Sequence, residues 1–360
     1  MSVLDLVRPD LREFSGYLSA RKQNGGGDVW LNANEAARAQ PFDGQQLNRY
    51  PEPQPQALKA ALCDYYAVSA EQLLVTRGSD EAIDLLVRAL CVPGQDSIVI
   101  QSPTFGMYAV SARLHACTTV DSPLREIDGR FDWDIPAMID AALNNGSKLL
   151  FLCSPANPTG QSLPTEALET LLRALQGRCL VVVDEAYGEY SRNGSATALL
   201  ERFSNLAVLK TLSKAQALAG ARIGCVIADA GLITVLKACQ APYPISKPSA
   251  EIALAAFAPA NLARTYEGIS ACLGERDRMQ EALTALPVVR RVFESAANFL
   301  LVRFDDSAAV CRYLLERGII VRAMSQYPAI TDCLRISIGT PDENAALLTA
   351  LNTFCRDSHA

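Results

Sequence analysis

A lysine that could carry chemistry follows an apolar run in the middle of the chain. Residues 206–211 have the composition of a buried strand, and Leu212, Ser213 and Lys214 come directly after them. A lysine at a strand end can form an imine with a carbonyl compound once its amine has lost its proton. Burial and neighbouring cations lower the pKa of such an amine. A solvated surface lysine is the ordinary alternative, but the small and apolar residues around Lys214 argue against it.

Two further segments could bind an anion. Ser213 and Arg222, eight residues beyond Lys214, offer a hydroxyl and a fixed positive charge suited to a phosphate group. Residues 76–81 read as a turn that opens a helix, in which Gly78 permits close backbone approach. The free N–H groups at a helix start attract phosphate, although an ordinary N-cap is the simpler reading. The chain has neither Gly-x-Gly-x-x-Gly nor a Walker-type Gly-Lys-Ser, so the motifs do not favour a nucleotide as the source of that phosphate.

An acid and an amide also follow predicted strands. Asp184 ends the run 179–184, and Asn157 lies in the turn 154–160 that follows the run 148–153. In open α/β sheets, ligands gather at the carboxyl ends of the strands. Asp184 is therefore a candidate for holding a cationic ring nitrogen, with a helix N-cap as its alternative role. Asn157 is expected to be its neighbour in space.

The elements that would position these residues alternate along the chain. Continuous apolar runs separated by amphipathic segments predict strands covered on both faces, and hence an α/β fold with a mostly parallel sheet. Beyond residue 250 the strands are fewer and more widely separated, which predicts a smaller α+β lobe. The predicted strands are 97–101, 148–153, 179–184, 206–211, 224–228, 299–304 and 333–338, and the predicted helices include 81–90, 164–175, 308–317 and one or two in 250–286.

Composition excludes several classes of protein. The formal net charge of −6 argues against non-specific nucleic-acid binding. With only His115 and His359, a Ser-His-Asp triad or a multi-histidine metal site is not expected, and no metal site is predicted. The 11 cysteines are scattered without a Cys-x-x-Cys pair, as is typical of free thiols in a reducing cytoplasm. No apolar run reaches transmembrane length and no signal peptide is recognisable, so neither a membrane nor a nucleic-acid partner is predicted.

Taken in order, these segments resemble the fold-type I, pyridoxal-phosphate-dependent aminotransferases, and within them the histidinol-phosphate aminotransferase family. Any one of the segments is unspecific, but together they run almost from end to end of the chain. They are residues 31–35, 48–51, 77–81, 103–108, 153–160, 183–187, 211–222 and 334–340, with smaller agreements at 241–244 and 298–301.

The resemblance implies an architecture and an assembly. The fold would be that of a fold-type I transferase, with a large domain built on a mostly parallel sheet flanked by helices and a smaller α+β domain. Residues 1–45 would form an N-terminal arm joining the small domain, 46–250 the large cofactor-binding domain, and 251–360 the small C-terminal domain. The protein would be a cytoplasmic homodimer.

The resemblance also assigns roles around the cofactor, pyridoxal 5'-phosphate. Lys214 would hold it as an imine and then act as general base and acid in the proton shift. Asp184 would pair with the pyridinium nitrogen and keep the ring an electron sink. Asn157 and Tyr187 would hydrogen-bond the ring 3-oxygen, and Phe105 would stack on the ring face.

Further residues would hold the two anionic groups. The cofactor phosphate would be bound by Gly78, Ser79, Asp80, Ser213 and Arg222, and by Tyr50 reaching over from the neighbouring subunit. The substrate anion would be gripped by Arg335 and Arg322, with Tyr17 and Asn157 beside them.

Two positions depart from the family's pattern. Ala156 stands where the family often has asparagine, and Phe105 where the stacking residue is often tyrosine. Asn157 is kept, and phenylalanine preserves the ring face while losing a hydroxyl. Neither change is expected to affect cofactor binding.

The leading hypothesis is transamination between L-histidinol phosphate and 2-oxoglutarate, giving imidazole acetol phosphate and L-glutamate, in histidine biosynthesis. Aromatic amino acid transamination and decarboxylation of threonine phosphate are the alternatives, because relatives with the same catalytic residues carry them out. A pyridoxal-phosphate-binding regulator ranks last, since such proteins usually add a DNA-binding domain and this acidic chain leaves no room for one.

Overall fold

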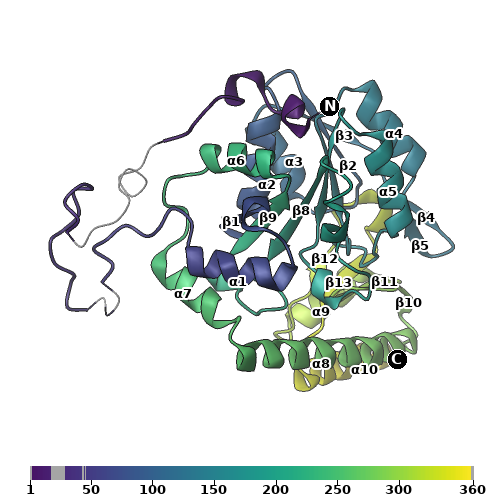
Figure 1. The fold of residues 1–360 in the computed structure, drawn as a ribbon. Coiled ribbons are helices and arrows are strands. Elements are labelled where there is room, and N and C mark those ends of the chain that lie inside the picture. Colours follow the sequence, from purple (N-terminus) through teal and green to yellow (C-terminus); the bar gives the residue numbers. More distant parts are fainter. Residues whose placement is uncertain (1, 18–28, 43, 45, 358–360) are drawn as a thin grey trace.

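The computed structural model describes residues 2–17, 29–42, 44 and 46–357. A seven-stranded sheet forms the centre of the molecule (Figure 1), and β9 is the one strand that runs against the others in it. The remaining neighbours in the row from β8 to β3 pair in parallel. In sheet order the strands are β1 (Leu73–Thr76), β9 (Gly224–Ala228), β8 (Leu206–Thr211), β7 (Leu180–Asp184), β6 (Leu149–Cys153), β2 (Ser97–Ile100) and β3 (Thr118–Asp121). The predicted mostly parallel sheet is confirmed.

Helices cover both faces of this sheet because its strands are apolar on both sides. Successive strand residues enter opposite cores: Phe151 belongs to the core on one face and Leu152 to the core on the other. One face carries α2 (Gly78–Leu90), α3 (Met107–Leu114) and α6 (Ala230–Cys239). The other carries α1 (Gln56–Tyr66), α4 (Ile135–Asn144), α5 (Thr165–Ala174) and α7 (Lys247–Ala255).

A second, four-stranded antiparallel sheet lies in the C-terminal part of the chain. Its own core is formed with the long helix α8 and the helices α9 and α10. α8 begins with Pro259, whose fixed φ and missing N–H suit a first helical position. The strands in sheet order are β10 (Val289–Val292), β11 (Phe299–Phe304), β13 (Cys333–Ser337) and β12 (Arg322–Ala323), the helices are α8 (Pro259–Thr284), α9 (Ser307–Leu315) and α10 (Pro341–Asp357), and a separate hairpin joins β4 (Arg125–Ile127) to β5 (Arg130–Asp132).

The beginning of the chain packs with the large sheet. Val3, Leu6 and Val7 are buried in the same core as α2 and α6, whereas residues 29–42 lie apart from the body at the left of Figure 1. Residues 3–7 thus contact the large sheet rather than the small domain that we expected the arm to join. The division at residues 45 and 250 remains a prediction. Among the described residues, no helix has the length and apolar character needed to cross a membrane.

Candidate active site

A cavity of about 170 Å³ opens at the carboxyl ends of the central strands. β6, β7 and β8 run in parallel, so the residues at their ends come together there, with Cys153 opposite Asp184 in the register. The cavity brings together most of the predicted cofactor residues. It is lined by Ser79, Asp80, Phe105, Cys153, Asn157, Asp184, Ala186, Tyr187, Thr211, Ser213, Lys214, Ala219 and Arg222.

Lys214 lies in the turn that follows β8 and is half-buried. Burial lowers the pKa of its amine, and the positive charges of Arg335 and Arg222 lower it further. Its Nζ lies 5.6 Å from the centre of the Tyr187 ring. The amine therefore loses its proton more readily than a solvated lysine would, which is the condition for nucleophilic attack on a carbonyl group.

Asp184 ends β7 and is almost completely buried, with 1% of its surface exposed. Its Oδ2 accepts a hydrogen bond from the Tyr108 hydroxyl at 2.8 Å, and its Oδ1 accepts one from the backbone N–H of Ala186 at 3.1 Å. Burial raises the pKa of this carboxyl group to about 6. A buried carboxylate held by two neutral donors would be stabilised by a cationic ring nitrogen.

Tyr108 is the functional residue that our sequence reasoning did not assign. It is fully buried, stacks on Phe151 at 4.8 Å between ring centres, and meets the edge of Phe105 at 5.7 Å. Packing on both sides fixes its hydroxyl on Asp184. Its place in the matched segment 103–108 was the one available signal, because nothing local marks a buried tyrosine as a partner of an acid 76 residues away.

Asn157, Tyr187 and Arg335 form a chain of polar contacts. The Asn157 Nδ2 donates to the Tyr187 hydroxyl at 3.3 Å, and the Arg335 Nη1 donates to the Asn157 Oδ1. Arg335 comes from β13 of the small sheet, and its guanidinium lies 5.5 Å from the centre of the Phe299 ring. Burial raises the pKa of the Tyr187 hydroxyl, which therefore remains a donor. These contacts connect residues that follow strands of the large sheet, Asn157 and Tyr187, to Arg335 of the four-stranded sheet.

The end of the cavity at which we predict the phosphate to bind is built around the start of α2. Gly78 has a φ of +73°, a backbone conformation that favours glycine, and a side-chain Cβ there would also displace the Arg222 guanidinium, whose Nη2 would lie 2.7 Å away. Arg222 donates to Asp80 at 3.0 Å and to the Ser213 Oγ at 3.4 Å. The backbone N–H groups of the first turn and this guanidinium present positive charge to the same part of the cavity.

Five predicted residues are absent from the cavity lining. Gly78 precedes the lining residue Ser79, and Arg335 donates to the lining residue Asn157; the other three are Tyr50, Tyr17 and Arg322. Tyr50 is half-exposed and stacks on Tyr243, with ring centres 4.5 Å apart. Tyr17 is exposed over 66% of its surface. Arg322 is exposed on β12, directly opposite Arg335 in the strand register. Within one chain, the structure brings neither tyrosine to the cavity.

The donors and acceptors in the cavity fit a flat, cationic ring that carries an aldehyde and a phosphate. An amine with a lowered pKa could form the imine, and a helix start with an arginine suits the dianion. Among the residues that the structure describes, the buried carboxylate of Asp184 forms no ion pair, which leaves it suited to the cationic ring. These features, on a mostly parallel sheet flanked by helices, define a pyridoxal-phosphate type of site.

Comparison with known proteins gives the family. Residues 24–351 match the family model described as aminotransferase class I and II, and the chain belongs to this family. It is 53% identical over 351 residues to a protein of Xanthomonas campestris named histidinol-phosphate aminotransferase, with 97% of each chain covered.

Solved structures agree on the fold. The histidinol-phosphate aminotransferase of Sinorhizobium meliloti, determined in complex with pyridoxal 5'-phosphate, superposes with a TM-score of 0.77 at 25% identity and covers 90% of both chains. That of Clostridium acetobutylicum has a TM-score of 0.79 at 23% identity, over 86% of this chain and 92% of the other. The predicted fold-type I architecture is confirmed.

Proposed function

We propose that this enzyme transfers the amino group of L-histidinol phosphate to 2-oxoglutarate in histidine biosynthesis, with pyridoxal 5'-phosphate as its cofactor. The observation that carries the proposal is one cavity that combines Lys214, the buried Asp184 and the cationic start of α2. The name of the 53% identical relative supports the choice of substrate.

The cofactor would be held along the length of the cavity. Asp184 would face its ring nitrogen, and Phe105 would cover a face of the ring. Asn157 and Tyr187 would hydrogen-bond the ring oxygen. When bound, pyridoxal phosphate supplies an electron sink for the negative charge that develops beside the substrate's amino group. The phosphate would be held by the backbone of Gly78, Ser79 and Asp80 and by the side chains of Ser213 and Arg222.

Lys214 would move the proton. Its unprotonated Nζ would accept the proton from the substrate carbon that bears the amino group and would later return one to the product. The positive charges of Arg335 and Arg222 favour the neutral amine that this step requires. Tyr108 and Ala186 would keep Asp184 in place throughout, because both hydrogen bonds hold its carboxylate.

Arg335 would bind the anionic end of each substrate in turn. The phosphate of L-histidinol phosphate and the distal carboxylate of 2-oxoglutarate both suit a guanidinium fork. The contact with Asn157 orients this arginine from the cofactor side. Arg322, its register partner on β12, would add a second positive charge, and Tyr17 would close over this end.

A homodimer is part of the proposal. Val29, Leu31 and Phe42, three apolar residues of one segment, are exposed over 80%, 89% and 87% of their surfaces. A second copy would cover this segment and receive Tyr50 at its cofactor phosphate. All eleven cysteines are free and eight are buried, which favours a reducing compartment and hence the cytoplasm.

Mixed dimers test the shared site. A dimer of one Tyr50→Phe chain and one Lys214→Ala chain would contain one site with both residues intact. We expect such dimers to regain about half of the wild-type activity, whereas each variant alone is impaired. If the mixed dimers were only as active as Tyr50→Phe dimers at half the number of sites, Tyr50 would serve its own chain.

The substrate is tested by half-reactions of the cofactor-loaded enzyme, followed by absorbance. L-Histidinol phosphate and L-glutamate should each convert the cofactor fully, and L-phenylalanine should react at least about tenfold more slowly, because it lacks the distal anion. Equal rates with L-phenylalanine would favour an aromatic aminotransferase. Release of carbon dioxide from threonine phosphate without a need for 2-oxoglutarate would favour the decarboxylase.

A further inference from the structure

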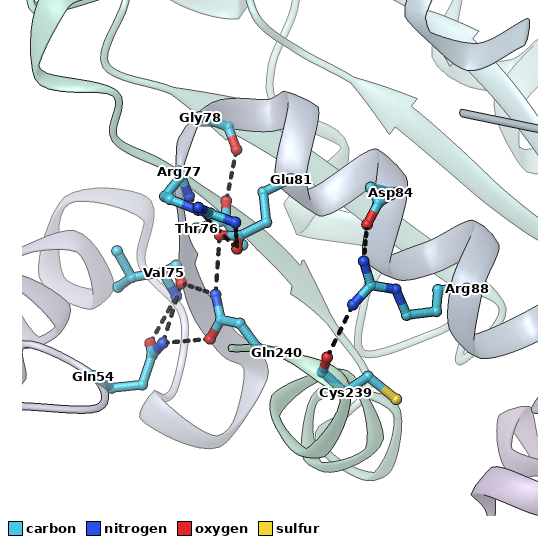
Figure 2. Close-up of polar contacts among 10 residues, drawn as sticks. All are labelled: Gln54, Val75, Thr76, Arg77, Gly78, Glu81, Asp84, Arg88, Cys239 and Gln240. Carbon is cyan, nitrogen blue, oxygen red and sulfur yellow. Dashed lines mark hydrogen bonds and ion pairs between the residues drawn. The ribbon is translucent and has the colours of Figure 1, made fainter. Parts of the chain in front are cut away.

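Two segments that are distant in sequence meet behind the start of α2. Gln54 precedes α1, and Gln240 follows α6. Both side chains are buried, with 2% and 9% of their surfaces exposed, and the Gln54 Nε2 donates to the Gln240 Oε1 at 2.9 Å. Figure 2 shows the two amides side by side, next to the backbone of Val75.

Gln54 completes the open edge of the large sheet. β1 is the edge strand, and Val75 lies on it. The backbone N–H of Val75 donates to the Gln54 Oε1 at 2.9 Å, and the Gln54 Nε2 donates to the Val75 carbonyl oxygen at 3.1 Å. The carboxamide thus makes the two bonds that a neighbouring strand would otherwise make. β1 runs directly into the turn at Gly78, so holding Val75 fixes the origin of that turn.

Gln240 extends the network to the first turn of α2. Its Nε2 donates to the Val75 carbonyl oxygen at 3.0 Å and to the Glu81 Oε2 at 3.2 Å. Glu81 in turn accepts a hydrogen bond from the backbone N–H of Arg77 at 2.7 Å (Figure 2). In each carboxamide, both N–H groups donate a hydrogen bond and the oxygen accepts one. A buried network in which every polar group is hydrogen-bonded holds its side chains in a single conformation.

The same two segments meet again at Tyr50 and Tyr243, which stack at 4.5 Å with an angle of 14° between the rings. Tyr50 lies four residues before Gln54, and Tyr243 lies three residues after Gln240. The buried amide pair and the stacked tyrosines therefore fix the two segments at two points. The amide pair contacts the first turn of the chain's own α2. The tyrosine stack contains Tyr50, which is proposed for the partner's site.

We propose that Gln54 and Gln240 form an amide bridge that positions the phosphate-binding turn 78–80 of its own subunit and, through Tyr50, the phosphate end of the partner's cavity. Both are positioning residues, because they act through Glu81, Val75 and Tyr50. The inference rests on the proposed function, from which it takes the cofactor phosphate and the dimer. It adds a physical link between the two active sites.

Arg88 provides a matched control. Its Nη1 donates to the Cys239 carbonyl oxygen at 3.3 Å and its Nη2 pairs with Asp84 at 2.5 Å, so it also ties α2 to the end of α6 (Figure 2). Arg88 lies about three turns beyond the start of the helix. Arg88→Met removes a contact between the same two helices without touching the amide bridge.

The first experiment compares Gln240→Met with Arg88→Met, using pyridoxal phosphate and pyridoxal as ligands. In Gln240→Met the affinity for pyridoxal phosphate should fall about tenfold, as expected for one to two lost buried hydrogen bonds. The affinity for pyridoxal, which lacks the phosphate, should stay within about twofold. Hydrogen exchange at residues 78–81 of the cofactor-free protein should also become faster. Arg88→Met should change none of these quantities by more than about twofold.

Equal losses for both ligands, or equal effects of the two variants, would overturn the positioning role. That outcome is distinct from failure of the proposed function, which would appear as a wild-type protein that binds no pyridoxal phosphate.

The second experiment tests the link between the subunits with Gln54→Met in mixed dimers. One chain carries Lys214→Ala, so a single site can form a borohydride-trappable adduct. Gln54→Met is placed either on the chain that supplies Lys214 to this site or on the chain that supplies Tyr50. We expect the affinity of the intact site for pyridoxal phosphate to fall several-fold in both placements. An effect in only one placement would show that the bridge serves a single site.

Discussion

Two acid–lysine pairs lie at the ends of the same two strands, and they differ in what surrounds them. Glu185 and Lys210 are buried together, with the carboxylate and the amine 2.6 Å apart. Asp184 ends β7 and Lys214 follows β8, and both line the cavity proposed for the cofactor. Residue types and strand positions are nearly the same in the two pairs, yet one pair supports the fold and the other is suited to chemistry.

The charges around each lysine explain the difference. Burial alone would lower the pKa of Lys210, but attraction by Glu185 and Glu189 outweighs it and raises the pKa. Burial also lowers the pKa of Lys214, and the positive charges of Arg335 and Arg222 lower it further, which outweighs the opposing effect of Asp80 and Asp184. We expect Lys214 to be the reactive lysine, because positive charges lower the pKa of its amine further and, among the described residues, it forms no ion pair with a carboxylate.

The largest expected effect separates the two lysines by reactivity. Lys214→Ala should abolish the borohydride-trappable adduct with pyridoxal phosphate and lower kcat by at least about 10³-fold, because both the nucleophile and the proton carrier are lost. Peptide mapping of the trapped wild-type enzyme by mass spectrometry should place the label on Lys214 and leave Lys210 unlabelled. A label on Lys210, or an adduct that persists in Lys214→Ala, would contradict the comparison.

The sequence predicts the reactive pair but not the structural one. Lys214 and Asp184 each follow an apolar run and stand within segments that resemble a known family. Lys210 lies inside such a run, and its partner Glu185 directly follows another strand, β7. Pairing across strands is set by the register of the sheet, which local sequence does not encode.

The same limit applies elsewhere in the fold. The central strands were predicted, whereas β1 was not: its free edge is completed by the side chain of Gln54, a contact that no local pattern indicates. Tyr108 and Gln240 escaped notice for the same reason, since their partners are distant in sequence. Tyr50 was assigned through the resemblance. It lies outside its own chain's cavity, so the role proposed for it requires a second copy of the chain.

The next effect in size is on stability, at Lys210. Lys210→Met should lower the free energy of unfolding of the cofactor-free protein by about 3–5 kcal/mol, because it leaves Glu185 and Glu189 buried without a cation. Urea unfolding measures this change. The double variant Lys210→Met/Glu185→Gln should recover part of the loss, since one buried charge is removed. If the single variant does not fold, the stability of the double variant can be compared with that of the wild type instead.

A loss below about 1 kcal/mol in Lys210→Met would mean that water or a shifted proton already neutralises this cluster. The trapped adduct at Lys214 should be unchanged per folded molecule, because Lys210 does not line the cofactor cavity. If the adduct were lost as well, the Glu185–Lys210 pair would also be needed for the reactivity of Lys214.

The smallest effect concerns the two acids and depends on pH. Burial raises the pKa of Asp184 from 3.8 to about 6 in the folded, cofactor-free chain, so its charged form is disfavoured by folding. The resulting cost is fully present above pH 6, fades as the pH falls from 6 to 3.8, and disappears below 3.8, where the carboxyl group is protonated in both states. Asp184→Asn should therefore stabilise the cofactor-free protein at pH 8, by up to about 3 kcal/mol, and by progressively less toward pH 4.

Glu185→Gln, one residue away, should do the opposite at pH 8, because it leaves Lys210 without its closest partner. Urea unfolding of both variants at pH 4.5, 6 and 8 shows whether each one raises or lowers the free energy of unfolding relative to wild type. Once pyridoxal phosphate is added, Asp184→Asn should become less stable than wild type. The variant loses the negative charge that would face the ring nitrogen and therefore binds the cofactor more weakly. If Asp184→Asn were less stable than wild type at pH 8 without the cofactor, the carboxylate would already be satisfied by Tyr108 and Ala186, and its suitability for a cationic ring would need another explanation.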